Sequence, residues 1–567
     1  MPKARFVKKN MPDIIFLPEK KTVRVALGAS IAEAARTAGV VIETPCGGAL
    51  ICGKCKVKID ASDLPRVDTC GAHMLSDAER AEGCVLACAS TVRGDIRVTV
   101  PDGAGATGET QTVKSGVSFD TGIDPEIYKA YIKERDETCV RAASGATLGT
   151  ESGDTGGCLY GCVVDIGTTT LAAELTDMKT GAAAATVTSV NPQTAYGQDV
   201  LSRILFASDP QGLDTLRASV LREINAMLAR LCGETGISAE HVYEIVLSGN
   251  TAMLHIAMGI DPSSLGRVPF SFRLKGGESF NAKESGFDIS DFGLVYLPPL
   301  ISAYVGADIC SGIMAARLHR LNGRSLFLDI GTNGEMLIAD NGKLCAASTA
   351  AGPAFEGMNI KFGSRAVKGA IEYFKIEDTD DFTVRAIGGA APSSICGSGL
   401  MDIVGELVVN GVIDESGRFE SAESLPRGLA ARMIEADGKP AFSLAQDVYL
   451  TQQDVRQVQL AKGALRAGVE TLLAVAGAGA DELDRVLIAG SFGYHLRAES
   501  MINIGLLPAS FAGKIEFLGN TSQSGGRAFL MNRAYRDEIA AAVPAVEVVE
   551  LANRADFNDL FIDCLSF

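Results

Sequence analysis

The sequence predicts two domains, a compact α+β unit near the N-terminus and a large α/β module that contains an internal repeat. Three observations lead to this prediction. The chain has 567 residues, whereas a single hydrophobic core stops growing near roughly 250–300 residues. Several cysteines lie close together in one glycine-rich loop near the N-terminus. Much later in the chain, an apolar strand that ends in Asp-Ile-Gly-Thr occurs twice.

The composition is that of a globular protein. Hydrophobic residues make up 47% of the chain and charged residues 21%, which leaves little room for long disorder. The formal net charge is -17. Nucleic-acid binding requires clustered Lys and Arg that neutralise phosphates, and no such cluster is evident. We therefore expect a protein or small-molecule partner and no nucleic acid.

The N-terminal residues do not resemble a targeting segment. No apolar stretch precedes a small-residue cleavage site, and no later run of eighteen apolar residues offers a membrane span. The sequence thus predicts a cytoplasmic protein without membrane contact. In that reducing compartment the 14 cysteines are not expected to form a disulfide framework, so clustered cysteines indicate a metal site.

The N-terminal unit has an alternating order of elements. A strand and a turn at Gly28 lead into a helix that Ser30 caps and that ends near Gly39. The cysteine-bearing loop follows, and after it come a strand over Lys56–Ile59, a helix over Ser76–Glu82 and strands around Cys88 and over Ile96–Val100. These elements make a compact unit of about 100 residues.

Next come a linker and then the large module. Pro101–Ser118 is rich in Gly, Thr and Ala, which is typical of a flexible linker. We expect a short helical connector over Pro125–Val140 before the α/β pattern begins. The predicted organisation is 1–100 for the first domain, 101–157 for linker and connector, and 158–567 for the module, whose lobes cover about 158–325 and 326–567.

The internal repeat consists of Val163–Thr170 and Phe327–Gly334, whose aspartates, Asp165 and Asp329, are 164 residues apart. Each copy is an apolar strand that ends in Asp and is followed by Gly, Thr and a second apolar strand. The second copy continues into Asp340–Lys343, whose Asn-Gly pair is a strong hairpin signal. Two similar halves, each opening with strand, turn and strand, are the natural interpretation.

Three thiolates in one loop and a fourth further along predict a [2Fe-2S] cluster. Cys46, Cys52 and Cys55 are separated by five and two residues, and Cys88 follows after 32 more. Such a cluster needs four thiolates, and a glycine-rich loop lets the backbone approach the inorganic sulfides. The five-residue first gap is similar to that of vertebrate-type ferredoxins such as adrenodoxin.

Zinc is the alternative for this region. Cys52 and Cys55 together with Cys84 and Cys88 have a spacing that a structural four-thiolate zinc site tolerates. Zinc would leave Cys46 unexplained within its glycine loop. Cys70, Cys84 and the dispersed cysteines are better explained as small buried hydrophobic residues. None of the five histidines has a metal-ligand spacing.

The two Asp-Ile-Gly-Thr segments have the form of phosphate-binding loops. The glycine permits close approach of the backbone to a phosphate, the Thr hydroxyls and amides donate to its oxygens, and the Asp is placed to hold Mg²⁺ through water. One such loop also occurs in ordinary hairpins, but two copies are a stronger signal. A third element, Val486–Gly493, is an apolar strand that ends in a glycine-rich turn suited to an adenosine.

The chain from Asp165 onward resembles the superfamily of ATPases that includes sugar kinases, heat-shock chaperones and actin. The resemblance implies a duplicated α/β, RNase H-like ATPase fold, and for the first domain a ferredoxin-like (β-grasp) fold. It implies Asp165 and Asp329 as catalytic residues. The residues expected to bind the nucleotide are Gly167, Thr168, Thr169, Thr170, Gly249, Asn250, Gly331, Thr332, Asn333, Gly334, Glu335, Gly397, Gly399, Gly490, Ser491, Phe492 and Gly493.

The whole arrangement is most similar to the reductive activators of corrinoid-dependent enzymes, which join a [2Fe-2S] domain to this ATPase fold. The segments that carry the resemblance include CGGALICGKCKVKI, NPQTAYGQDVLSRI, LSGNTAMLHI, FLDIGTNGEMLI, STAAGPAFEGMNI, ICGSGLMDIV and LIAGSFGYHL. Pro101–Gly157 departs from the family, because it is shorter than the linker and middle domain of that group. This departure leaves open how the cluster domain docks.

The resemblance implies ATP-dependent reduction of an inactive Co(II) corrinoid protein of a methyltransferase system to Co(I). The expected cofactors are a [2Fe-2S] cluster, ATP and Mg²⁺. The electron donor and the oligomeric state are open, with a homodimer among the expectations. Two other functions remain: a small-molecule kinase with a fused ferredoxin domain, and a redox adaptor whose ATPase half is a nucleotide-gated interaction module.

Overall fold

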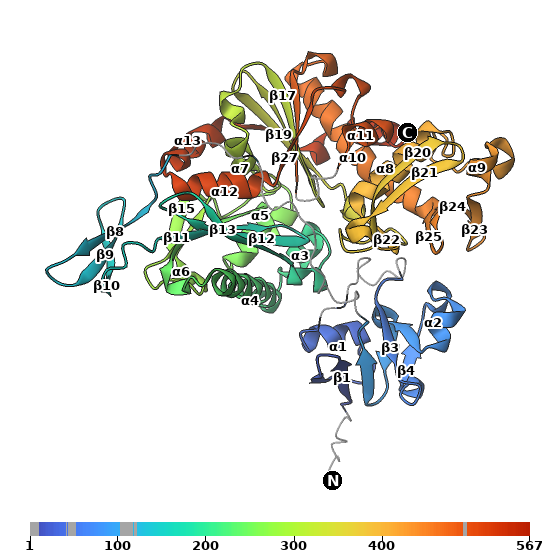
Figure 1. Cartoon of the computed structure of the whole chain (residues 1–567), viewed down its shortest axis with the longest axis horizontal. Helices are drawn as coiled ribbons and strands as arrows, with labels where there is room; N and C mark the ends of the chain where they lie inside the picture. The colour runs from blue at the N-terminus through green and yellow to red at the C-terminus, as the bar shows by residue number, and fades with distance from the viewer. Residues whose placement is uncertain (1–10, 41, 43–52, 102–116, 118–121, 491–495) are drawn as a thin grey trace, which may run out of the picture. The chain divides into compact units, whose positions relative to one another are not determined.

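The computed structural model describes residues 11–40, 42, 53–101, 117, 122–490 and 496–567. The chain divides into two compact units (Figure 1). One comprises residues 1–109 with 192–198, and the other comprises 110–191 with 199–567. Among the described residues, no helix combines the length and apolar character that a membrane crossing would need.

The first unit is a mixed five-stranded sheet with a helix packed against it. The sheet order is β2-β1-β7-β3-β5, and β1 runs parallel to β7. Its core includes Ile14, Phe16 and Ile31, all fully buried. The elements are β1 (Asp13–Leu17), β2 (Lys21–Arg24), α1 (Ile31–Thr37), β3 (Lys56–Ile59), β4 (Val67–Thr69), α2 (Asp77–Ala81), β5 (Cys84–Leu86), β6 (Ser90–Val92) and β7 (Ile96–Thr99).

Most of the expected elements of this unit are present. Ser30 caps α1 and Ser76 caps α2, each with a reciprocal capping box that satisfies two amides at the helix start. The sequence pattern did not predict β1. It also placed Cys88 in a strand, whereas Cys88 lies in a 3₁₀ turn between β5 and β6.

The helix expected over Pro125–Val140 is wrong. A three-stranded antiparallel sheet occupies this region, made of β8 (Ile127–Ile132), β9 (Glu137–Ala142) and β10 (Thr147–Ser152). Asp136 adopts a positive φ of 49° at the turn between β8 and β9, and the β-branched and aromatic residues of both strands favour extended backbone. Val140 is fully buried in the core of the second unit. The exact domain boundaries stay a prediction.

The second unit contains two six-stranded sheets with matching topology. One has the order β13-β12-β11-β14-β16-β15 and the other β27-β26-β17-β18-β19-β28. In each sheet an antiparallel meander is followed by a parallel strand beside its first member, β14 beside β11 and β26 beside β17. The expected duplication is therefore confirmed. The strands are β11 (Tyr160–Ile166), β12 (Thr170–Asp177), β13 (Ala183–Val190), β14 (Val242–Gly249), β15 (Glu278–Asn281), β16 (Leu294–Leu297), β17 (Arg324–Ile330), β18 (Gly334–Asp340), β19 (Lys343–Thr349), β26 (Arg485–Ala489), β27 (Ile515–Gly519) and β28 (Glu547–Val548).

The hairpin predicted at Asn341-Gly342 joins β18 to β19. Asp340 pairs with Lys343, and Asn341 and Gly342 have φ values of 48° and 83°. Positive φ at both central residues is the geometry of a tight two-residue hairpin. This part of the prediction is confirmed at the level of single residues.

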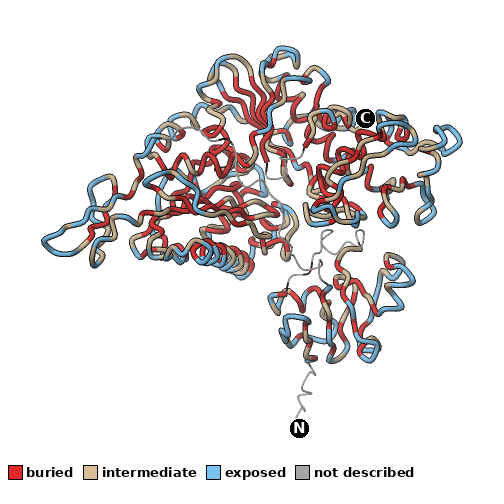
Figure 2. The backbone as a smooth tube through the Cα atoms, viewed as in Figure 1, coloured by how far each residue is buried: buried red, intermediate tan, exposed pale blue. Residues whose placement is uncertain are grey.

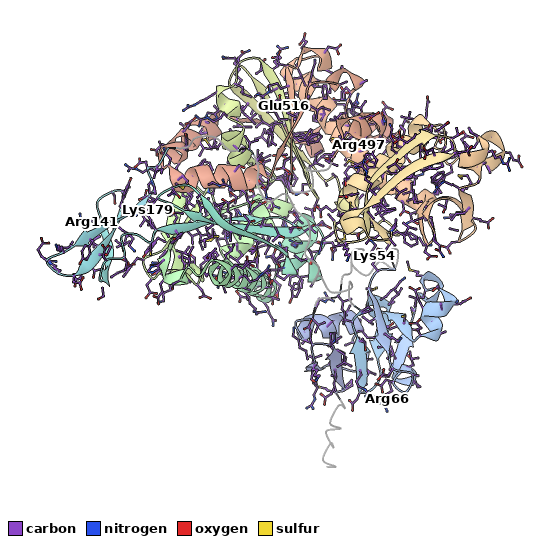
Figure 3. All side chains as sticks on the ribbon, in the orientation of Figure 1. Lys54, Arg66, Arg141, Lys179, Arg497 and Glu516 are labelled. Atoms are coloured by element: carbon purple, nitrogen blue, oxygen red, sulfur yellow. The ribbon has the colours of Figure 1, made fainter. Side chains whose placement is uncertain are left out.

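Helices cover the two sheets, whose central strands are buried along most of their length (Figure 2). Helix α4 packs on β12 and β13, α10 packs on β18 and β19, and α12 contacts both α7 and β14. Arg497, labelled in Figure 3, donates from Nε to Asp402 Oδ1 at 3.0 Å, which joins the segment before α11 to α8. The helices are α3 (Val200–Phe206), α4 (Pro210–Thr235), α5 (Thr251–Ala257), α6 (Ala282–Ser285), α7 (Ala307–Ala315), α8 (Gly397–Val409), α9 (Arg427–Ala430), α10 (Gln452–Ala476), α11 (Ala498–Asn503), α12 (Thr521–Met531), α13 (Ala534–Ala542) and α14 (Phe557–Asp563).

Two further three-stranded sheets extend the second half of this unit. Their orders are β21-β20-β22 and β23-β24-β25. They comprise β20 (Ala370–Asp378), β21 (Asp381–Ala386), β22 (Ser394–Ile395), β23 (Met433–Ala436), β24 (Lys439–Ala445) and β25 (Val448–Thr451).

Candidate functional site: two phosphate loops and a cysteine pair

Asp165 lies at the end of β11 and is held by the start of α12. Its Oδ2 accepts a hydrogen bond from Asn520 Nδ2 at 3.0 Å, and its Oδ1 accepts one from Ser522 Oγ at 2.9 Å. Asn520 is the N-cap of α12, because its Oδ1 accepts from the amide of Gln523. Burial nevertheless raises the pKa of Asp165. The carboxylate is therefore fixed in orientation by two groups that are 355 and 357 residues away in the sequence.

Asp329 occupies the equivalent position in β17, and two further carboxylates lie near it. Burial, together with the charges of Asp308 and Asp165, raises the pKa of Asp329 to about 8. Burial and the charge of Asp165 raise the pKa of Asp308 to about 7. Glu335 is also raised well above its ordinary pKa, by burial and by Asp308 and Asp329. Four carboxyl groups thus share one region, where a cation would favour their ionised forms.

Asp308 was missed by the sequence analysis. It lies in the first turn of α7, after the N-cap Gly306, and accepts a hydrogen bond from the amide of Ile309 at 2.8 Å. The signal in the sequence was an acid in the first turn of an apolar helical segment. That local pattern does not indicate that α7 begins beside both phosphate loops, because this position is set by the tertiary fold.

The region suits a hydrated cation better than a dehydrated one. Among the described residues, no three His, Cys, Asp or Glu side chains converge closely enough to hold a bare metal ion. Mg²⁺ keeps several of its waters and is usually bound by one or two carboxylates plus nucleotide phosphates. The carboxylates present fit that mode of binding.

The two phosphate loops contact each other directly. Thr169 Oγ1 and Thr332 Oγ1 are 3.1 Å apart, and Thr332 donates to Glu356 Oε1 at 2.6 Å. In the first loop the amide of Gly167 donates to Thr170 O at 3.0 Å, and a Cβ at Gly167 would lie 2.5 Å from that oxygen. The second loop closes in the same way, since Gly331 N donates to Asn333 O at 2.9 Å.

Two glycines occupy equivalent places beside the loops. Gly249, with φ of 152°, ends β14, and a Cβ there would lie 2.7 Å from Ile166 O. Gly490, with φ of 126°, follows β26, and a Cβ there would lie 2.5 Å from Ile330 O. Only glycine fits such an approach. Ser491, Phe492 and Gly493 lie outside the described residues.

Asn250 connects the first loop to α5. Its Nδ2 donates to Thr168 Oγ1 at 3.2 Å, and its Oδ1 accepts from Met253 N as the N-cap of α5. The N-terminus of this helix therefore lies at the phosphate loop, where a helix dipole favours an anion.

Gly397 and Gly399, which the resemblance implied as nucleotide-binding residues, occupy the first turn of α8. A Cβ at Gly397 would lie 1.8 Å from Phe355 O, and one at Gly399 would lie 2.1 Å from Ile371 O. Similarly, a Cβ at Gly334 would lie 2.0 Å from the side chain of Leu465. Close packing explains these glycines, and their nucleotide contact stays a prediction.

In the first unit, two of the four predicted cluster ligands lie together. Cys55 Sγ and Cys88 Sγ are 3.2 Å apart, too far for a disulfide bond. The amide of Ala87 donates to Cys55 O at 2.8 Å, which holds the two segments together. The hydrogen bond with Cys88 lowers the pKa of Cys55 to about 7, in the direction that thiolate ligation requires. Cys46 and Cys52 lie outside the described residues.

Cys84 differs from this pair. It is in β5 opposite Lys58, and burial raises the pKa of its thiol. The pKa directions of Cys55 and Cys84 are thus opposite, and the ligand set Cys46, Cys52, Cys55 and Cys88 stays a prediction.

Comparison with protein-family models defines the class. Residues 15–93 match the 2Fe-2S iron-sulfur cluster binding domain, residues 160–321 match the RACo middle region, and residues 323–567 match the C-terminal domain of RACo, the ASKHA domain. The protein is thus a ferredoxin-type domain joined to an ASKHA-type module, and the predicted fold class is confirmed.

Individual relatives define the family. The chain is 30% identical over 416 residues to the corrinoid activation enzyme RamQ of Eubacterium limosum, covering 71% of this chain and 70% of the relative. It is 26% identical to a [Co(II) methylated amine-specific corrinoid protein] reductase of Methanosarcina barkeri, covering 72% and 77%. A solved structure of a reductive activator for corrinoid, iron-sulfur protein aligns over 98% of both chains, with 29% identity and a TM-score of 0.74. The chain belongs to this family of reductive activators of corrinoid proteins.

Proposed function

We propose that this protein transfers one electron from a [2Fe-2S] cluster to the Co(II) centre of a corrinoid protein of a methyltransferase system, giving Co(I), in a reaction that requires Mg-ATP. The single observation that carries the proposal is the union in one chain of the Cys55–Cys88 pair with two phosphate loops that contact each other through Thr169 and Thr332. Family membership supports the same activity.

Cys46, Cys52, Cys55 and Cys88 would hold the cluster. The cluster would act as a one-electron carrier of low reduction potential, which is about -400 mV in plant-type ferredoxins. The observed pair needs only two further thiolates, and the glycine-rich loop before Cys55 provides them in the sequence. The lowered pKa of Cys55 and the backbone bond from Ala87 support this ligand set.

The nucleotide would lie between the ends of β11 and β17. The amides and hydroxyls of Gly167–Thr170 and Gly331–Gly334 would donate to its phosphates, and Asp165 and Asp329 would hold the waters of Mg²⁺. Gly490–Gly493 would lie against the adenosine. The raised pKa values of Asp329 and Asp308 mean that an arriving cation also removes a repulsion between carboxylates.

ATP is needed because the electron transfer is uphill. A gap of about 100 mV between the reduction potential of the cluster and that of the Co(II)/Co(I) couple corresponds to roughly 2.3 kcal/mol for one electron. Binding energy supplies this amount if the nucleotide favours a state of the protein that binds the partner differently. Thr169 and Thr332 belong to different halves of the second unit. A ligand that binds both loops would therefore change how these two halves are arranged.

The direct experiment is anaerobic mixing of the reduced protein with a corrinoid protein in the Co(II) state. With Mg-ATP and a low-potential chemical reductant, we expect the Co(II) absorption to give way to that of Co(I), or of methyl-Co(III) when a methyl donor is present. The proposal also includes a corrinoid protein as partner, an unidentified low-potential electron donor, a homodimeric state and a cytoplasmic location.

A kinase is the second candidate, and Asp308 is the observation that favours it. Phosphoryl transfer to a hydroxyl needs a carboxylate in the cleft that accepts the proton, and Asp308 lies beside both phosphate loops with a pKa of about 7. Formation of a phosphorylated small molecule would establish the kinase. Electron transfer at the same rate without ATP would instead favour the redox adaptor.

A further inference from the structure

Helix α3 has two contrasting faces. On its inner face Arg203 is fully buried, and it donates to Thr168 O and, at 3.2 Å, to Met253 Sδ. On its outer face Leu201 and Leu205 are 55% and 76% exposed. These two leucines are one turn apart and lie on the same side of the helix. Thus α3 touches the first phosphate loop with one face and offers large apolar side chains to the solvent with the other.

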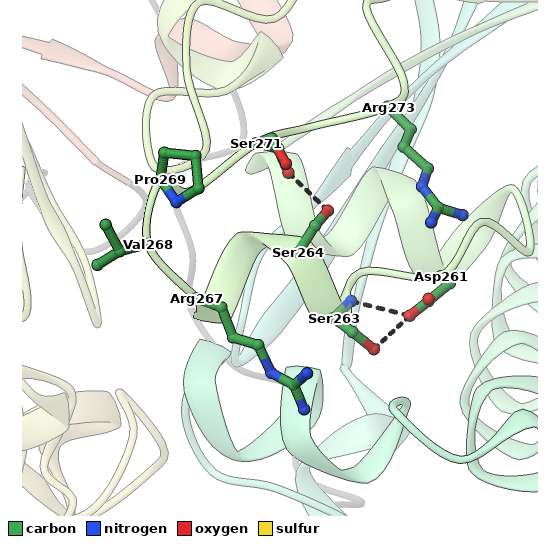
Figure 4. Close-up of a pocket in the computed structure, with 8 residues that line it drawn as sticks. All are labelled: Asp261, Ser263, Ser264, Arg267, Val268, Pro269, Ser271 and Arg273. Carbon is green, nitrogen blue, oxygen red and sulfur yellow. Dashed lines mark hydrogen bonds between the residues drawn. The ribbon is translucent and has the colours of Figure 1, made fainter.

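The loop of residues 261–275 packs beside α3 and is positively charged. Its short helix, Ser263–Gly266, packs on α3, and a Cβ at Gly266 would lie 3.2 Å from Ile204. The segment contains three basic residues and one acidic residue, although the whole chain has a net charge of -17. It surrounds a hollow of about 340 Å³ lined by Arg267, Arg273, Asp261 and serine residues (Figure 4).

The charges of this loop face outward. Figure 4 shows Arg267 and Arg273 on the two sides of the Asp261–Ser263 segment, with Val268 pointing away from it. Asp261 is already engaged, since its Oδ1 accepts from Ser263 N at 2.9 Å, and this serine and the two arginines lower its pKa. Val268 is 75% exposed. The loop therefore exposes one apolar side chain, Val268, and two arginines, Arg267 and Arg273.

Helix α5 ties the loop to the same phosphate loop. His255 is fully buried, and its Nε2 accepts hydrogen bonds from Arg273 N and Leu274 N, each at 3.2 Å. Its Nδ1 lies 2.7 Å from Thr251 O and donates to it. At the other end of α5, Asn250 bonds to Thr168. Helices α3 and α5 thus each contact both the first phosphate loop and the 261–275 loop.

We propose that the corrinoid protein docks on one surface of this chain, called here the α3–loop surface, which is formed by Leu201, Leu205, Arg267, Val268 and Arg273. The face of the partner that binds there is an apolar patch rimmed by carboxylates. This inference rests on the proposed function and names where its partner binds. Exposed apolar side chains beside arginines are the composition of protein interfaces. Because this chain is acidic as a whole, a partner with an acidic rim is attracted to the local positive patch and repelled by the rest of the surface.

A protein occupant fits better than a small anion. The two arginines are exposed and the hollow is shallow, so a lone phosphate would stay in contact with water and gain little. The apolar side chains of Leu201, Leu205 and Val268 make no favourable contact with such an anion. The attachment of both helices to Thr168 gives nucleotide binding a route to this surface.

The test uses the full chain with its cluster, Mg-ATP and a panel of purified corrinoid proteins that includes a methylated-amine corrinoid protein and a corrinoid iron-sulfur protein. Leu205→Asp and Arg267→Glu should each raise the KM for the corrinoid protein by about tenfold or more, with little change in kcat. Val409→Asp, at a side chain 63% exposed in the other half, and Lys439→Glu are the matched controls. Both should leave the KM unchanged. Unfolding temperature and the visible spectrum check the folding of every variant.

The outcomes separate the inference from the function on which it rests. If the wild-type protein reduces no member of the panel, the proposed function fails. If it reduces one and the KM is unmoved in both surface variants, the docking inference is overturned. Titration with inorganic phosphate that detects binding lost in Arg267→Glu, with the KM unchanged, would assign the surface to a free anion. A wild-type dimer that Leu205→Asp converts to a monomer, with the KM unchanged, would assign it to a second copy of this chain.

Discussion

Replacing Asp308 by Asn should stabilise the nucleotide-free protein at neutral and alkaline pH. Burial beside Asp165 raises the pKa of Asp308 to about 7 from an ordinary value of 3.8. The folded state therefore binds a proton more tightly than the unfolded state does. Stability is fully retained below about pH 4, decreases as the pH rises through 7, and then levels off.

The size of the effect follows from that shift. Each pKa unit is worth about 1.4 kcal/mol, so a shift of roughly three units corresponds to at most about 4 kcal/mol of repulsion and desolvation at pH 8. Asp308 is half-buried, and partial access of solvent reduces this figure to about 2–3 kcal/mol. The asparagine side chain of the variant cannot ionise, and it removes this penalty while nearly preserving the shape of the aspartate.

The assay is calorimetric unfolding of the wild-type protein, Asp308→Asn and the exposed control Glu435→Gln across pH 5 to 8.5, without nucleotide or Mg²⁺. The variant should unfold several degrees above the wild type at pH 8 and by less than half that margin at pH 5, because the loss begins near the unfolded pKa of 3.8 and is complete only above the folded pKa of about 7. The control should follow the wild type throughout. Added Mg-ATP should narrow the gap, because the cation relieves the same repulsion in the wild type. A variant that is less stable at pH 8, or a difference that does not change with pH, would refute the electrostatic reasoning.

Three further predictions concern the cluster and the nucleotide. Ser in place of Cys46, Cys52, Cys55 or Cys88 should abolish or perturb the visible and EPR signals of a [2Fe-2S] cluster, while Cys84→Ser should keep them; stoichiometric zinc without iron would contradict this assignment. Asp165→Ala and Asp329→Ala should lower Mg-dependent ATP turnover at least about tenfold without bleaching the cluster, and wild-type calorimetry that detects no nucleotide binding at millimolar concentration would argue against the site. Gly490→Ala should weaken ATP binding, because the added Cβ would meet Ile330 O at 2.5 Å; unchanged affinity would show that the turn adapts.

The sequence predicted those features whose signals are local. The capping boxes at Ser30 and Ser76, the hairpin at Asn341-Gly342 and the strand over Lys56–Ile59 each depend on a few neighbouring residues, and each is present. The repeat of Asp-Ile-Gly-Thr indicated two halves because the same backbone geometry recurs at both sites. Such features need no knowledge of distant contacts.

The features that the sequence did not predict depend on tertiary contacts. The region of β8 and β9 was predicted as a helix, although Val140 is buried in the core of the second unit and Lys129 donates to Tyr243 Oη, 114 residues away. The hydrogen bonds from Asn520 and Ser522 to Asp165 also depend on tertiary contacts. So does the position of Asp308 beside both phosphate loops. For Gly397 and Gly399 the motif was visible, but the close packing of α8 that explains it was not.

The most direct test of the central claim is the rate of Co(I) formation with and without nucleotide, measured anaerobically on a corrinoid protein that the reduced wild-type protein can activate. The account predicts that omission of ATP, or use of Asp329→Ala, stops the conversion although the [2Fe-2S] cluster is still reduced. Conversion at the same rate and to the same extent without nucleotide would contradict it.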